Sequence, residues 1–213
     1  MNGAAVIAEI LRREGTEFLS CYPRNPLIEA CAALDMRPIL CRQERVGVGL
    51  ADGYTRVKHG KRNGVFAAQA GPGIENAFPG VAQAFSENVP LLVIPAGLPL
   101  ARQYVRPVFR AADVYRPVTK WSALAHSVQE LPDLMRRAYH AMRSGKGGPV
   151  LIEVPAEVWE AEYEATSITL PSRSSARRLI PTRSRPPCVC CSRRKIRCCW
   201  PGRACSMRKR ATG

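Results

Sequence analysis

The feature of this sequence that most limits its fold is a set of short, almost wholly apolar stretches. The three clearest are GVFAAQA (64–70), PLLVIPAG (90–97) and GPVLIEVP (148–155). Such runs are typical of strands that are buried on both faces of a sheet. Shorter apolar runs at 17–22 and 37–41 have the same character. Because amphipathic stretches separate these runs, we predict an α/β protein with a Rossmann-like parallel sheet flanked by helices on both faces.

Capping residues and apolar periodicity predict helices between the strands. Asn2 and Ser127 can cap the first and last helix, and Pro26 can open the second, where its missing N–H costs nothing. The helices are predicted within residues 1–15, 26–35, 42–60, 74–88 and 129–145. Residues 98–118 have no clear period and are predicted to form a long loop or a short helix, before a strand within 121–128.

Charge and cysteine divide the chain into two parts. The net charge of +15 would favour a nucleic-acid or membrane partner if it were evenly spread. Residues 1–164, however, contain 19 Lys/Arg and 17 Asp/Glu, whereas residues 165–213 contain 13 Lys/Arg and no acidic residue. Six of the nine cysteines also lie after residue 187. We therefore predict one folded domain over 1–164 and a disordered basic tail over 165–213.

The sequence favours a cytoplasmic protein. No window approaches the roughly 18 apolar residues of a membrane span, and the first 15 residues lack the basic region and cleavage site of a signal peptide. In a reducing compartment, the scattered thiols of Cys21, Cys31 and Cys41 are expected to be small buried side chains.

Candidate functional residues follow the first three predicted strands. Ligands of parallel α/β sheets bind beyond the carboxyl ends of the strands. There the sequence places CYPRNP (21–26), RQE (42–44) and QAGPGIEN (69–76). Taken alone, these signals have simpler explanations, because the helix dipole favours a glutamate in a first turn and GPG suits an ordinary tight turn.

The three features together are more specific. The segments RQERVGVGLADGYTR, GVFAAQAGPGIENAFPGVAQAFSENVPLLVIPAG and GPVLIEVPAEVW occur in this order within residues 3–160. In spacing and order this region resembles the N-terminal pyrimidine-binding domain of thiamine-diphosphate enzymes of the acetolactate synthase-like group. The resemblance implies the pyrimidine-domain fold and thiamine diphosphate as the cofactor.

The resemblance also implies site residues. Glu44 matches the catalytic glutamate that hydrogen-bonds N1' of the cofactor's aminopyrimidine and promotes its proton transfers. The other implied cofactor-binding residues are Pro23, Asn25, Gly71, Pro72, Gly73 and Asn76. This sequence departs from the usual pattern in three places: Arg24 follows Pro23 where glycine is usual, Gln43 replaces a common histidine, and Leu98 replaces a common glutamine. These departures concern the substrate more than the cofactor.

In the family, Mg²⁺ and the diphosphate are held by a second domain through a GDG…N motif, and no GDG occurs here. We therefore expect no metal ligands in this chain, and we expect Mg²⁺ to be held by a domain outside it. The resemblance implies a homo-oligomer that acts on 2-keto acids as a carboligase or decarboxylase, with this chain inactive alone. Two alternatives are a 2-keto acid decarboxylase fragment and a non-catalytic fragment that binds partner subunits.

The stretch CVCCSRRKIRCC (188–199) resembles half of a fungal binuclear zinc cluster, a DNA-binding module. Cys205 lies at a plausible distance, but Arg208 stands where another cysteine is needed. Read one step out of frame, residues 165–171 can encode DLDYTP and residues 190–210 can encode LLAAENPLLLAGQGVLYAEA, which resembles the family's next domain. We therefore interpret 165–213 as a frameshift product without a nucleic-acid partner. A basic extension with its own use and a zinc module are the alternatives.

Overall fold

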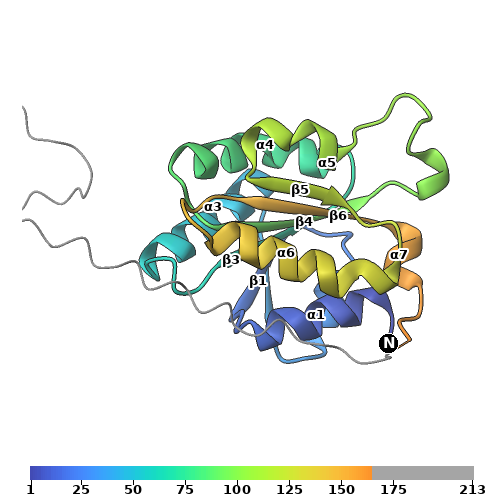
Figure 1. The fold of residues 1–213 in the computed structure, drawn as a ribbon, viewed down its shortest axis with the longest axis horizontal. Helices are drawn as coiled ribbons and strands as arrows, with labels where there is room; N and C mark the ends of the chain where they lie inside the picture. Colours follow the sequence, from blue (N-terminus) through green and yellow to red (C-terminus); the bar gives the residue numbers. More distant parts are fainter. Residues whose placement is uncertain (165–213) are drawn as a thin grey trace, which may run out of the picture. The chain divides into compact units, whose positions relative to one another are not determined.

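The computed structural model describes residues 1–164, which form a sheet of six strands between two layers of helices (Figure 1). The strands are β1 (Phe18–Cys21), β2 (Arg37–Leu40), β3 (Gly64–Ala68), β4 (Leu91–Gly97), β5 (Trp121–Leu124) and β6 (Val150–Pro155). All neighbouring strands are parallel, and their order is β2-β1-β3-β4-β6-β5. The predicted fold class is confirmed. The domain boundary after residue 164 and the frameshift interpretation concern residues outside the described part.

The helices cover both faces of the sheet. The α-helices are α1 (Gly3–Arg13), α2 (Leu27–Ala32), α3 (Glu44–Val57), α4 (Pro72–Ser86), α5 (Ala111–Val114), α6 (Leu131–Arg143) and α7 (Ala156–Glu160). The short 3₁₀ helices are η1 (Leu100–Arg102), η2 (Arg116–Val118) and η3 (Val128–Glu130). One layer contains α3, α4 and α5, and the other contains α1, α2, α6 and α7 (Figure 1).

The central strands pack against both helix layers through side chains on their two faces. Every residue of β3 and β6 is buried. Side chains alternate between the faces of a strand, so in β4 Leu92 and Ile94 pack in the core beneath α1 and α6, whereas Leu91 and Val93 pack in the core beneath α3 and α4. Complete burial of one such side chain contributes about 1.5–3 kcal/mol. The runs are apolar at nearly every position because both faces of these strands are buried under helices.

The predicted caps are present. The side chain of Asn2 accepts a hydrogen bond of 2.9 Å from the backbone N–H of Ala5, and Ser127 forms a capping box with Glu130. Helix α4 begins at Pro72, two residues earlier than predicted, and α7 was not predicted.

The structure also tests the predictions about the cysteines and about a membrane span. Cys21 and Cys31 are buried as expected, but Cys41 is only half-buried, because it follows the edge strand β2. None of the helices formed by residues 1–164 is long and apolar enough to cross a bilayer.

Candidate functional site

The site lies where the connections of the sheet change direction. After β1 the chain moves outward to the edge strand β2, and after β2 it returns across β1 to form β3. The α2 connection and the α3 connection lie on opposite faces of the sheet. At such a switch point the loops diverge and leave a crevice beyond the carboxyl ends of the strands. The loop after β1, the start of α3 and the loop after β3 all lie at this edge.

Glu44 is the central acidic residue of this crevice. It is the first residue of α3 and only 6% exposed. Its Oε2 accepts a hydrogen bond of 2.7 Å from the side-chain amide of Asn76 on α4. Among the residues that the structure describes, its other oxygen, Oε1, has no hydrogen-bond partner. A nearly buried carboxylate is thus held by one oxygen, and the second oxygen has no partner among residues 1–164.

Glycines allow the first turn of α4 to approach Glu44. A Cβ at position 73 would lie 2.5 Å from Cγ of Gln69 and 3.2 Å from Oε1 of Glu44, so only glycine allows this close approach without displacing a neighbour. Gly71 precedes the helix with a φ of 66°, in the left-handed region that favours glycine. Pro72 follows as the first helical residue and is exposed.

Asn25 is buried and uses its side chain within the protein. Its amide donates hydrogen bonds to the carbonyl oxygens of Ala68 (2.8 Å) and Ile94 (3.0 Å), and its Oδ1 accepts one from the backbone N–H of Leu27 (3.0 Å). Asn25 therefore connects the loop after β1 to the end of β3 and the middle of β4. Because both amide protons are used, its side chain supports the loop rather than offering a donor to a ligand.

The neighbouring residues of this loop are exposed. Arg24 has a φ of 69°, in the left-handed region, which gives a physical reason why glycine is usual at this position. Pro23 and Arg24 line a hollow of about 580 Å³ that extends to α2 and to Leu40 at the end of β2. The structure thus joins Glu44, Gly73 and Asn76 by direct contacts and places Pro23 at the rim of a neighbouring hollow.

Comparison with known proteins agrees with this arrangement. A family profile described as "Thiamine pyrophosphate enzyme, N-terminal TPP binding domain" matches residues 1–130. The chain belongs to this family. It is 33% identical over 193 residues to the chloroplastic acetolactate synthase of Arabidopsis thaliana, covering 87% of this chain and 28% of that protein.

Two further relatives show the same partial coverage. The chain is 35% identical over 164 residues to chloroplastic acetolactate synthase 2 of Nicotiana tabacum, covering 74% of this chain and 24% of that protein. It is 29% identical over 171 residues to the acetolactate synthase large subunit of Haemophilus influenzae, covering 77% of this chain and 29% of that protein. The chain therefore contains an N-terminal TPP binding domain similar to that of acetolactate synthases, and it spans about a quarter to a third of the length of these relatives.

The crevice of this TPP binding domain fits the aminopyrimidine half of the cofactor. That ring needs a carboxylate for N1' and a surface close to the backbone. Glu44 supplies an uncommitted oxygen, and Gly73 brings the backbone of α4 close to it. The donor set of the crevice therefore agrees with the family's cofactor.

Sequence reasoning missed two buried polar residues that hold α5 and α4. Glu153 on β6 is 2% exposed, and its Oε2 accepts a hydrogen bond of 2.8 Å from the backbone N–H of Ala112. Burial raises the pKa of its carboxyl group. Tyr115 is fully buried and donates from its hydroxyl to the carbonyl oxygen of Ile74 (2.5 Å). The acidic residue within the apolar run LIEV was a signal for Glu153, whereas no local pattern marks Tyr115.

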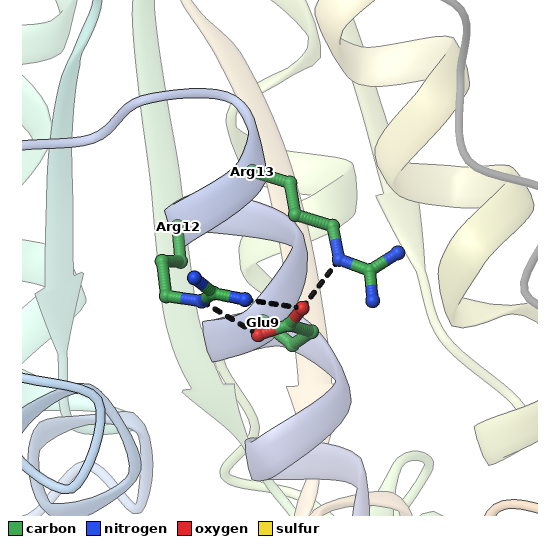
Figure 2. Close-up of polar contacts among 3 residues, drawn as sticks. All are labelled: Glu9, Arg12 and Arg13. Atoms are coloured by element: carbon green, nitrogen blue, oxygen red, sulfur yellow. Dashed lines mark hydrogen bonds and ion pairs between the residues drawn. The ribbon is translucent and has the colours of Figure 1, made fainter.

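A carboxylate with a strongly lowered pKa, that of Glu9, lies outside the crevice on α1 (Figure 2). Arg12 donates to Glu9 over 2.8 Å and 2.9 Å, and Arg13 donates to the same carboxylate. These contacts lower the pKa of Glu9 to about 2, and the hydrogen bond from Arg12 has the largest effect. The end of α1 precedes β1 and so lies near the amino ends of the strands, opposite Glu44. This cluster is an ion-pair network on a helix and has no part in the crevice.

Proposed function

We propose that Glu44 binds N1' of the aminopyrimidine of thiamine diphosphate and exchanges a proton with it. The observation that supports this role is the pairing of Glu44 with Asn76, which orients the carboxylate and leaves Oε1 uncommitted. The absence of a side chain at Gly73 lets the backbone of α4 lie directly beside that oxygen. When bound, the cofactor supplies the chemistry of bond making and breaking beside a 2-keto acid carbonyl.

The remaining implied residues shape this half of the site. Asn25 fixes the loop after β1, and Pro23 lies at the rim of the hollow next to that loop. Gly71 and Pro72 set the turn that brings Asn76 to Glu44. We propose that residues 1–164 are one domain, and that the diphosphate and Mg²⁺ are held by a different domain. The whole enzyme is then a cytoplasmic carboligase or decarboxylase of 2-keto acids.

A second function, binding of partner subunits, is favoured by the outer face of α3. Val46, Leu50 and Val57 are 56%, 36% and 75% exposed although they are apolar. Gly49 and Gly53 lie at helical spacing from them, and nothing lies within 4 Å of a Cβ built at either position. Small and apolar residues on one helix face allow close packing of another helix. We propose that this face joins copies of the chain in a homo-oligomer, and Leu50→Glu is expected to lower the mass measured by analytical ultracentrifugation.

The test of Glu44 uses a fragment of the cofactor, because half a site binds weakly. NMR titration of the purified 213-residue chain with 4-amino-5-hydroxymethyl-2-methylpyrimidine should shift the backbone amides of Glu44, Gly73 and Asn76 at millimolar concentration. Glu44→Gln should remove these shifts, whereas the control Glu9→Gln on α1 should keep them. Shifts that persist unchanged in Glu44→Gln would contradict the proposal. Calorimetry with thiamine diphosphate and Mg²⁺ should show no micromolar binding.

The frameshift interpretation of residues 165–213 remains a proposal about the gene. Resequencing the DNA around codon 165 should show an inserted or deleted base. An intact reading frame would contradict it, and the zinc content of the chain and salt-dependent DNA binding would then distinguish the zinc module from a basic extension.

A further inference from the structure

Asn76 is the fifth residue of α4, and a proline follows three residues later within the same helix. Pro79 lies inside α4 and has no backbone N–H. In a regular helix that N–H would bond to the carbonyl group four residues earlier, which belongs to Glu75. The turn that presents Asn76 to Glu44 therefore lacks one of its own hydrogen bonds, and its position depends more on contacts from outside the helix.

Tyr115 supplies such a contact. Its hydroxyl donates to the carbonyl oxygen of Ile74 at 2.5 Å, within the first turn of α4. Its ring meets the ring of Phe78 edge to face, with centroids 5.0 Å apart. Ile74 and Phe78 lie on either side of Asn76 along the helix, and Tyr115 is fully buried against them. One side chain thus holds the helix both before and after Asn76.

Tyr115 is itself fixed to the sheet through α5, the single helical turn that precedes it. The N–H of Ala112 donates to Oε2 of Glu153 on β6 (2.8 Å), and the carbonyl of Ala112 accepts from Oγ of Ser122 on β5 (2.6 Å). The carbonyl of Tyr115 accepts from Oγ1 of Thr119 (2.8 Å). These bonds place the phenol at the end of a rigid support, because each involves a buried or half-buried group.

We propose that Tyr115 is a positioning residue for the Asn76–Glu44 pair. Its hydroxyl fixes the first turn of α4 so that the Asn76 amide stays within hydrogen-bonding distance of Oε2 of Glu44. The catalytic meaning of this role rests on the proposed function of Glu44. The mechanical effect on Asn76 does not, and it can be measured without any ligand.

The test follows the side-chain NH₂ protons of Asn76 by NMR in the full chain. Tyr115→Phe keeps the ring and removes the hydroxyl, and should speed solvent exchange of these protons about five- to tenfold, as expected for loss of one supporting hydrogen bond. The control is Tyr139→Phe, because Tyr139 is also buried but packs in the other layer. The amide of Asn25 serves as an internal reference in each variant. Unchanged exchange of Asn76 in Tyr115→Phe, or an equal change in Tyr139→Phe, would overturn the proposal.

A second variant tests the reason for the dependence. Pro79→Ala restores an N–H for the Glu75 carbonyl, so it should slow exchange of the Asn76 amide and reduce the effect of Tyr115→Phe. If Tyr115→Phe does not fold, Pro79→Ala alone decides: slower exchange supports the proposal, and no change overturns it. Titration with the pyrimidine fragment separates the two proposals. If Tyr115→Phe speeds Asn76 exchange but the fragment does not bind the unmodified chain, the role of Tyr115 is supported and the role of Glu44 is refuted. If the fragment binds but Tyr115→Phe leaves Asn76 exchange unchanged, the role of Glu44 is supported and the role of Tyr115 is refuted.

Discussion

Asn76 donates a hydrogen bond of 2.7 Å to Oε2 of Glu44, although the two residues lie on different helices and 32 positions apart in the chain. The bond joins the first turn of α3 to the second turn of α4 at the carboxyl edge of the sheet. It satisfies one oxygen of a carboxylate that is almost buried. We therefore expect the pair to contribute to the stability of the domain.

Removal of the Asn76 amide should destabilise the fold. Asn76→Ala leaves the buried Glu44 carboxylate without its donor and should lower the free energy of unfolding by about 1–3 kcal/mol. Asn76→Asp should cost more, because it places a second carboxylate beside the first. Urea denaturation followed by circular dichroism measures both. Gln83→Ala, at an exposed position of the same helix, should change stability by less than about 0.5 kcal/mol. If Glu44→Gln is already present, the additional cost of Asn76→Ala should shrink, and an undiminished cost would show that the two side chains are not coupled.

Asn25 should matter for the fold more than for ligand binding. Asn25→Ala leaves the carbonyls of Ala68 and Ile94 without the amide that bridges them and should lower the free energy of unfolding by about 2–4 kcal/mol. The neighbouring Arg24→Gly relieves a left-handed backbone but adds chain entropy, so it should be neutral or stabilise by up to about 1 kcal/mol. Thermal unfolding of the two variants compares them directly. A small cost for Asn25→Ala would mean that water replaces the side chain and that the loop does not depend on it.

The sheet and both helix layers could be predicted because buried strands leave a local apolar pattern in the sequence, and the family could be predicted from the resemblance of three ordered segments. The contacts around Tyr115 could not. Helix α5 is only four residues long, and its N–H groups depend on Glu153, which lies 41 positions after Ala112. The apolar residues of α3 were also ambiguous. Val48 is buried and Val46 is exposed, and a sequence does not distinguish an apolar residue of the core from one at a subunit interface.

Glu153 should make stability depend on pH in the direction opposite to most carboxylates. Burial raises the pKa of its carboxyl group in the folded chain, with Asp113 adding to this effect and Arg110 and the Ala112 N–H opposing it. Because the folded-state pKa lies above the unfolded value, the stabilisation is complete below about pH 4.5 and is lost as the pH rises through the folded-state pKa. Each tenfold difference between the two acid constants corresponds to about 1.4 kcal/mol.

Glu153→Gln isolates this effect, because glutamine keeps an oxygen for the Ala112 N–H but does not ionise. The free energy of unfolding of the unmodified chain should therefore fall relative to Glu153→Gln between pH 4 and pH 8. Glu9→Gln is the control, because the pKa of Glu9 is lowered to about 2 and its stabilisation is lost only as the pH falls below about 4.5. A difference between the unmodified chain and Glu153→Gln that stays constant across this range would show that Glu153 is ionised in the fold without cost.

The thiols of the described residues should react in an order set by burial. Burial raises the pKa of Cys21 to about 11 and that of Cys31 to about 12, so their thiolates are scarce at pH 8. Cys41 is half-buried and should be alkylated first by iodoacetamide, as measured by peptide mapping with mass spectrometry. Unfolding in urea should make the alkylation rates of the three thiols equal.

The same burial should make stability depend on pH. Because the folded-state pKa values of Cys21 and Cys31 lie above their ordinary value of 9.0, the stability that these thiols contribute should be lost as the pH rises towards 11. Rapid labelling of Cys31 at pH 8 in the folded chain would mean that α2 opens from the sheet far more often than its packing indicates.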